Sequence, residues 1–248
     1  MTIIVVPHHI DDPMPGLPSG HVVSAALGDG DVWDRLFPVY DALADAVAGA
    51  DRPVVVSGGC NASVGVLAGL QRGGSDPAVV WFDAHGDVQT LETTASGYLG
   101  GIALRLLVGY RPELIADRLG LRPLAEDRVA LVDARDLDPP EAEYLAGAAI
   151  RRCAVGDVAE ALPDGPLLLH VDLDVVDAEA LPGLRFPAAG GPSPSDVLAA
   201  VREVVATGRV VAADLAGTWD PDAPDPDGAR RRLLDEMVGI CVRGRGAA

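Results

Sequence analysis

The stretch VVWFDAHGD, residues 79–87, decides the fold, and a similar stretch, LLLHVDLD, follows at residues 167–174. Each begins as an apolar run typical of a buried strand and ends in Asp and His residues. Side chains alternate along a strand, so Asp83, His85 and Asp87 share one face while the chain stays extended. The first stretch therefore predicts a strand that delivers oxygen and imidazole donors at its carboxyl end.

The second stretch carries His170, Asp172 and Asp174 in the same alternation. With the two Asp of the first stretch, it brings four carboxylates into a largely apolar interior. Such carboxylates would repel one another and lose hydration unless a cation neutralised them, so the pattern predicts a divalent metal site. Solvated aspartates at strand ends, the alternative, do not normally form paired clusters around a His. We expect His170 to be a core or supporting histidine rather than a ligand, because it lies about 6–7 Å before Asp172.

Strand and helix patterns alternate along the whole chain. Short runs rich in Val, Leu or Ile predict strands at 2–6, 53–57, 78–83, 128–133, 148–152, 166–172 and 209–214. Helical patterns lie near 31–49, 61–72, 97–108, 140–146, 193–206 and 227–242. This alternation predicts an α/β protein with a mainly parallel sheet flanked by helices, with residues 1–248 forming a single domain. Ligands of such sheets bind beyond the carboxyl ends of the strands, where the metal motifs fall.

Composition limits the partners. The 248 residues have a formal net charge of −18, and Arg is the strong base throughout because the chain has no Lys. This balance argues against nucleic acid and anionic membranes and favours a small cationic ligand. We find no signal peptide or membrane-spanning pattern and expect a cytoplasmic protein. Three Cys, an odd number without metal-type spacing, fit reduced thiols.

Taken together, the motifs resemble the ureohydrolase family, the arginase and agmatinase relatives. The resemblance is carried by WFDAHGDVQT (81–90), SGYLGG (96–101), RDLDPPEAEYL (135–145), HVDLDVVD (170–177) and GGPSPSD (190–196). In order and spacing it covers about residues 54–221. It implies the three-layer arginase-like fold and hydrolysis of a C–N bond with the help of a metal. Oligomerisation is common in the family, so a homo-oligomer is one arrangement it implies, although no motif establishes it.

The resemblance also implies a ligand set. One ion would be held by Asp83, His85, Asp172 and Asp174, and a second would share Asp83 and Asp172 and add Asp87. The imidazole that completes the second position in the family is absent, because its Gly-Gly-Asp-His segment reads GGCN here, residues 58–61. An amide at residue 61 is a weaker ligand than imidazole, so we expect one fully ligated ion and a second that is weak or absent. The donors suit Mn(II) and leave Zn(II) or Fe(II) open.

Substrate class follows from the same resemblance. Asp136, Asp138 and Glu141 resemble residues that arginases use around an amino-acid α-ammonium group, and Gln89 and Ser96 resemble neighbours that hold its carboxylate. These residues imply a small guanidino amino acid as the substrate.

Two further departures affect the reacting end. Gly100 stands where arginases carry a His thought to shuttle protons, and Gly217 where they carry a Glu that pairs with the guanidinium group. Loss of these groups points to a substrate that needs less help, such as N-hydroxyarginine, which would give ornithine and a urea derivative. In this interpretation a metal-activated water attacks the guanidino carbon, with His85 as a ligand and Asp87 as a ligand or hydrogen-bond acceptor for the nucleophile.

Two other functions stay open on the sequence. One is a non-catalytic binding or scaffold protein that kept the fold, and the other is a single-metal amidohydrolase similar to deacetylases. The loop that contains His8, His9 and His21 could supply a replacement general acid, although a rigid surface loop is the favoured interpretation. Cys60 is most simply a small buried residue in a tight turn, with a soft ligand or a reactive thiol as the alternatives.

Overall fold

The computed structural model describes residues 2–23, 25–225 and 227–244. Its centre is an eight-stranded sheet in the order β4-β1-β5-β10-β9-β6-β7-β8, in which every pairing is parallel. The strands are β1 Ile3–Val6, β4 His21–Val22, β5 Val54–Ser57, β6 Ala78–Asp83, β7 Val129–Asp133, β8 Arg151–Cys153, β9 Leu167–Asp172 and β10 Val210–Ala216. Two short strands, β2 His8–His9 and β3 Asp12–Pro13, form a separate antiparallel pair.

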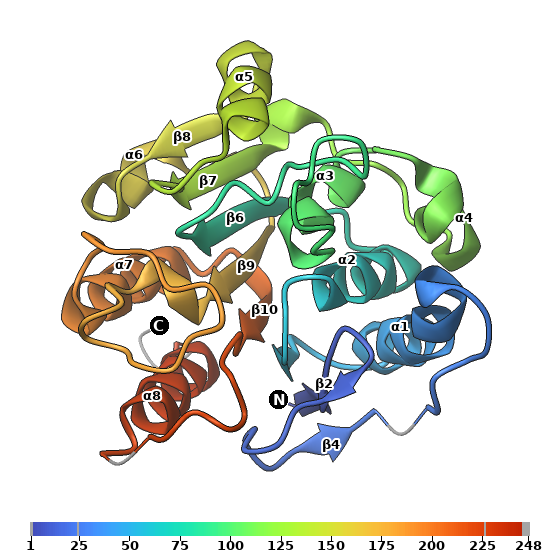
Figure 1. The fold of residues 1–248 in the computed structure, drawn as a ribbon, viewed down its shortest axis with the longest axis horizontal. Coiled ribbons are helices and arrows are strands. Elements are labelled where there is room, and N and C mark those ends of the chain that lie inside the picture. Colours follow the sequence, from blue (N-terminus) through green and yellow to red (C-terminus); the bar gives the residue numbers. More distant parts are fainter. Residues whose placement is uncertain (1, 24, 226, 245–248) are drawn as a thin grey trace.

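Helices cover both faces of this sheet (Figure 1). The α-helices are α1 Val32–Ala48, α2 Ala62–Arg72, α3 Ala103–Leu107, α4 Ala116–Leu119, α5 Pro139–Gly147, α6 Val158–Ala161, α7 Pro194–Ala206 and α8 Ala229–Arg243. Short 3₁₀ turns are η1 Gly100–Ile102, η2 Pro112–Leu114, η3 Glu126–Arg128, η4 Val155–Asp157 and η5 Leu173–Val175.

Alternation along the central strands divides the core into two layers. Val79 and Trp81 of β6 pack with α1, α2 and α3 on one face, whereas Val80 and Phe82 pack with α7 and α8 on the other. A strand buried on both faces must be apolar at every position, which explains the uninterrupted run before Asp83. This is the three-layer α/β fold expected from the sequence.

The expected elements are present with local differences. The helix expected near 97–108 is reduced to η1 and α3, since Gly100 and Gly101 favour a tight turn at its start. The strand expected at 148–152 is the shorter β8 at the sheet edge. The carboxyl ends of β6 and β9 lie side by side in the middle of the sheet, which brings the two Asp-rich motifs together.

Candidate metal centre and substrate pocket

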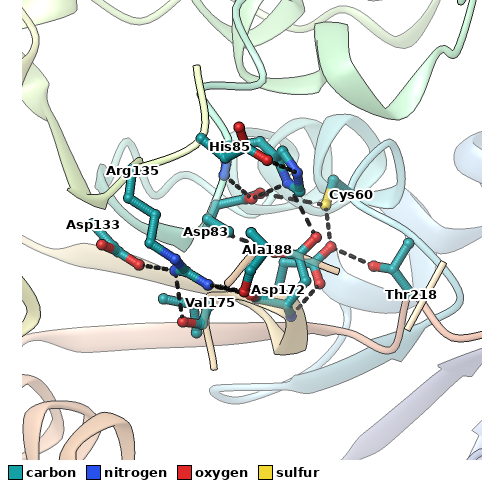
Figure 2. Close-up of polar contacts among 12 residues, drawn as sticks. Cys60, Asp83, His85, Asp133, Arg135, Asp172, Val175, Ala188 and Thr218 are labelled. Carbon is teal, nitrogen blue, oxygen red and sulfur yellow. Dashed lines mark hydrogen bonds and ion pairs between the residues drawn. The ribbon is translucent and has the colours of Figure 1, made fainter. Parts of the chain in front are cut away.

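Asp83 ends β6 and lies at the centre of the cluster, with an exposed fraction of 1%. Its Oδ1 accepts a hydrogen bond from the His85 backbone N–H at 2.8 Å and lies 3.3 Å from His85 Nδ1. Its Oδ2 accepts from Trp81 Nε1 at 3.2 Å and lies 3.9 Å from Cys60 Sγ. The two oxygens of one carboxylate therefore face two different groups of donors (Figure 2).

The first group combines Asp83 with His85 and Asp174. His85 Nδ1 lies 3.2 Å from Asp174 Oδ2, and one donor atom from each of the three residues lies within 4.8 Å of the others. Asp172, at the end of β9, accepts the Asp174 backbone N–H at 2.9 Å through its Oδ1, which fixes the turn that presents Asp174. The strand ends thus hold these carboxylates and the imidazole in one cluster.

Burial opposes the charges of this cluster. It raises the pKa of Asp87 and Asp174 well above the usual range, and with the neighbouring Asp83 charge it raises that of Asp172 to about 6. Burial alone would lower the pKa of His85, but hydrogen bonds and charges from Asp174 and Asp83 outweigh it and raise the value to about 12. Without a cation, the cluster therefore balances its charge by holding protons.

The donor set fits a divalent ion by a second observation. Asp87 is buried, and its Oδ2 has no hydrogen-bond partner among the described residues. A buried unpaired carboxylate oxygen is costly unless a ligand satisfies it. Asp87 also adopts a left-handed backbone with φ of 52°, in a segment fixed by the hydrogen bond from the Arg105 N–H to the Asp87 carbonyl at 3.0 Å. The loop, rather than an extended strand, thus aims this carboxylate into the pocket.

The segment GGCN, residues 58–61, in which we expected a metal ligand to be lost, presents Cys60 rather than Asn61 to the cluster. Asn61 does not stand in for an imidazole, because its Nδ2 points away and donates to the Leu99 carbonyl at 2.9 Å. The adjacent Cys60 points into the cluster instead, and its thiol donates to Asp172 Oδ2 at 2.9 Å. Thr218 donates its hydroxyl to the same oxygen. Cys60 is therefore more than a small residue in a turn.

A cavity of about 140 Å³ lies above these residues. Its floor is lined by Cys60, Asp83, His85, Asp87, Asp172, Asp174 and Thr218, and its rim by Gln89, Thr94, Ser96, Tyr98, Gly100, Gly101, Asp138, Glu141 and Phe186. Four of the five substrate-binding residues expected from the sequence are thus at the rim. The fifth, Asp136, is exposed and does not line the cavity, although its Oδ2 lies 3.9 Å from His85 Nε2.

Several polar residues of the rim form hydrogen bonds with one another or with nearby backbone groups. Gln89 Nε2 donates to Asp138 Oδ2 at 2.8 Å, and Thr93 Oγ1 donates to Gln89 Oε1 at 2.7 Å. Glu141 is buried and accepts the backbone N–H groups of Val88 and Asp138, both at 3.2 Å. Glu141 therefore fastens the loop after β6 to the start of α5, while Asp138 keeps an exposed carboxylate at the opening.

Aromatic side chains fill the space next to the two unusual glycines. A Cβ atom at Gly100 would collide with the ring and hydroxyl of Tyr98, and one at Gly217 would collide with the ring of Trp219. The Tyr98 ring lies 4.2 Å from that of Phe186 and stacks 5.7 Å from His9. The space beside Gly100 and Gly217 is therefore filled by aromatic rings. No local pattern in the sequence could have indicated this.

The three loop histidines do not enter the cavity. His9 is buried, and its Nδ1 lies 2.6 Å from the Gly58 carbonyl oxygen; burial lowers the pKa of His8 and His9. His21 is exposed in β4. His9 stacks on Tyr98 instead, so the expectation of a surface loop with solvated His residues is wrong for His9.

Arg135 connects the loop after β9 to the end of β7, which lies two strands away in the sheet. Its guanidinium donates to the Asp133 carboxylate and to the carbonyl oxygens of Val175 at 3.0 Å and Ala188 at 2.8 Å (Figure 2). Because a guanidinium presents several donors in a fixed plane, one side chain holds the segment that follows Asp174. From the sequence we expected no particular role for Arg135.

Comparisons with known proteins agree with this geometry. The sequence profile described as the Arginase family matches residues 21–221. An N(omega)-hydroxy-L-arginine amidinohydrolase of Streptomyces lavendulae is 30% identical over 237 residues, 93% of this chain and 83% of that protein. An arginase of Eremothecium gossypii is 30% identical over 211 residues, 78% of this chain and 53% of that protein. The chain belongs to the arginase family.

Solved structures show the same fold. The arginase of Bacillus caldovelox superposes with a TM-score of 0.83 at 21% identity, over 100% of this chain and 99% of that one. A proclavaminate amidino hydrolase of Streptomyces clavuligerus superposes with a TM-score of 0.69 at 20% identity, over 98% and 90% of the two chains. Among the residues that the structure describes, no helix is long and apolar enough to cross a membrane.

Proposed function

We propose that this protein is a metal-dependent hydrolase of the guanidino C–N bond of an arginine-like amino acid, with N-hydroxyarginine as the preferred substrate. The observation that carries the proposal is the buried cluster of four aspartates and His85 at the floor of a cavity. The relative from S. lavendulae, whose name specifies N-hydroxyarginine, supports the substrate class. The products would be ornithine and hydroxyurea.

In this proposal Asp83, His85, Asp172 and Asp174 hold one divalent ion, with Mn(II) as the metal that their mostly carboxylate donors favour. A second position shares Asp83 and Asp172 and adds Asp87. Because residue 61 contributes no imidazole there, we expect these three carboxylates to hold the second ion more weakly than the first set holds its own. When bound, a divalent ion lowers the pKa of water and polarises the group under attack.

The chain's own residues position the reactants. Asp87 Oδ2, which is buried and has no partner within the described ranges of the chain, accepts a hydrogen bond from the attacking water and orients it. The exposed carboxylate of Asp138 attracts the α-ammonium group, while Gln89, Ser96 and Glu141 shape the surrounding rim. Tyr98 excludes water from the reacting end, and its hydroxyl can donate a proton to the departing amine. Holding both reactants in this orientation contributes to the rate directly.

The test is a product assay on the full chain after Mn(II) loading. Ornithine and hydroxyurea or urea are quantified by chromatography with N-hydroxy-L-arginine and L-arginine as parallel substrates, and ions per chain are measured by elemental analysis. We expect kcat/KM for the hydroxylated substrate to exceed that for arginine by about tenfold or more, since a better leaving group or electrophile needs less assistance. Chelator-treated protein is the matched control.

The possible results separate the alternatives. Equal turnover of both substrates would refute the preference for N-hydroxyarginine but retain the guanidino hydrolase. A protein that binds the ion and releases no ornithine from either substrate would refute the enzyme and favour the binding or scaffold protein.

A further inference from the structure

His170 is fully buried in β9, two residues before Asp172 of the cluster. Its Nδ1 lies 2.8 Å from Asp214 Oδ2 on the neighbouring strand β10, and its ring stacks on Trp81 of β6 at 3.6 Å. The imidazole is therefore fixed on two sides by partners at the same level of three adjacent strands. Its other nitrogen, Nε2, is buried and has no hydrogen-bond partner among the described residues.

A second group of donors includes this imidazole. A ring nitrogen of His170, the Cys60 sulfur and a carboxylate oxygen of Asp83 all lie within 4.8 Å of one another. Because Asp214 engages Nδ1, the nitrogen available to this group is Nε2. The three residues come from three different segments and converge on the Cys60 side of Asp83, opposite His85.

We propose that Cys60 Sγ, His170 Nε2 and Asp83 form a binding position for a zinc-class ion, and that Asp214 holds the imidazole of His170 in place. This deepens the proposed function, on which it rests, by adding Cys60 and His170 to the donors of the second metal position of the same cavity. Strand spacing alone led us to expect a core or supporting role for His170. It gave no sign of the turn before α2, which brings Cys60 close to this imidazole.

The chemistry of the donors supports this assignment. A histidine ligand commonly donates its second ring N–H to a carboxylate, which fixes the tautomer and orients the ring, and His170 and Asp214 have this relation. Thiolate and imidazole together favour Zn(II) and similar ions, whereas the carboxylate-rich group around His85 favours Mn(II). Asp83 has one oxygen toward His85 and the other toward Cys60. It would therefore contribute to two metal positions that favour different metals.

A bound ion also resolves a feature that is unfavourable without it. The Nε2 atom of His170 is buried and has no partner in the described part of the chain, although buried polar groups are nearly always satisfied. The Cys60 sulfur points at the same cluster, 2.9 Å from Asp172 Oδ2 and 3.9 Å from Asp83 Oδ2. A bound ion would take the place of the thiol proton between the sulfur and these carboxylates.

Titration of the chelator-treated full chain with Co(II) tests the proposal without substrate. Thiolate coordination to Co(II) gives a charge-transfer band in the near ultraviolet, and visible bands report the geometry. We expect the wild type to show the thiolate band and Cys60→Ser to lose it. His170→Gln should weaken Co(II) binding at this position at least tenfold and alter the visible bands, and Asp214→Asn should weaken it about tenfold, as expected for a partner of a ligand.

Two controls keep the outcome interpretable. Cys241→Ser removes another buried thiol far from the cavity, in α8, and should leave the spectrum unchanged. Circular dichroism confirms that each variant is folded; if His170→Gln is not, competition of Zn(II) against Co(II) in Asp214→Asn replaces it.

Absence of a thiolate band in the wild type would overturn the proposal. A folded His170→Gln protein with the wild-type spectrum and Co(II) affinity would also overturn it. A normal band in a protein that releases no ornithine would instead refute the proposed hydrolase while leaving this metal position intact.

Discussion

The floor and the rim of the cavity are built on different principles. The floor consists of buried carboxylates and an imidazole delivered by the ends of β6 and β9, where the sheet fixes their positions. The rim consists of loop residues such as Ser96 and Asp138, which are exposed. Groups fixed on rigid strands suit the chemical step, and groups on loops suit recognition of the substrate. We therefore expect changes at the floor to lower kcat and changes at the rim mostly to raise KM.

The strongest challenge to this division is Asp83→Asn. Asp83 belongs to both groups of donors, so its loss should remove bound ions and lower turnover of N-hydroxyarginine on the order of 1,000-fold or more. Product release and elemental analysis measure the two effects. The exposed Asp117, in α4, provides the matched control as Asp117→Asn, which should behave as the wild type. An Asp83→Asn protein with full metal content and activity would show that the floor is not the reaction centre.

Tyr98 lines the rim, but we expect it to act in the chemical step and so to be an exception to this division. Its hydroxyl reaches the space beside Gly100, and burial raises its pKa well above the usual value, so it stays protonated as a donor. We expect Tyr98→Phe to lower kcat about 100-fold, within the range for a general acid, with little change in KM. Steady-state kinetics measure both constants.

Tyr144→Phe removes a hydroxyl outside the cavity, where it bonds to Glu126, and is the control for the Tyr98 variant. A Tyr98→Phe enzyme with unchanged kcat and a raised KM would place Tyr98 with the recognition residues of the rim.

At the rim itself, Asp138→Asn should raise KM about tenfold and leave kcat nearly unchanged. The reason is loss of a charge that attracts the α-ammonium group, with little change in shape. Asp136→Asn, outside the cavity, should have a smaller effect. Kinetics with a substrate that lacks the α-amino group measure the charge directly, since the two enzymes should then have similar KM values. A large loss of kcat in Asp138→Asn would contradict the division.

The smallest expected effect is a pH dependence of the free energy of unfolding of the metal-free protein. Folded His85 keeps its proton up to a pKa of about 12, whereas an unfolded His releases it near 6.5. The folded state therefore holds an extra proton between these values, and its stabilising contribution is complete below pH 6.5 and lost as the pH rises toward 12. From pH 6.5 to 9 we expect His85 by itself to lower the free energy of unfolding by up to about 1.4 kcal/mol per pH unit. The raised pKa values of Asp87 and Asp174 act in the same direction.

Denaturant titrations at several pH values measure this slope. The metal-loaded protein is the control, and its slope should be shallower because the ion displaces the protons of the cluster. Equal slopes with and without metal would mean that the floor does not titrate as described.

Local patterns in the sequence predicted much of the floor but little of its surroundings. The alternation of Asp83, His85 and Asp87, together with the apolar run before them, indicated a buried strand and its donors because both signals depend on neighbours in the chain. The contact of Cys60 with Asp172 joins segments 112 residues apart, and that of His170 with Asp214 joins neighbouring strands. Such contacts depend on strand order and on the turn before α2, which periodicity does not encode.

The unusual glycines show a similar limit. Comparison with the family pattern marked Gly100 and Gly217 as lost functional groups. It could not indicate that Tyr98 and Trp219 fill the adjacent space, because an aromatic ring reaches several ångströms from its own backbone. Likewise, Asp87 was expected on a strand face, but the chain turns before it, and a left-handed backbone sets its direction.

That backbone has a consequence for engineering. Asp87 combines a left-handed conformation, which Gly adopts more easily, with a buried unpaired oxygen, and both features reduce the stability of the metal-free fold. A library screened for heat resistance without metal or substrate should therefore enrich Gly or Asn at position 87. The enriched variants would be the less active ones, so heat resistance and activity should be selected together at this position.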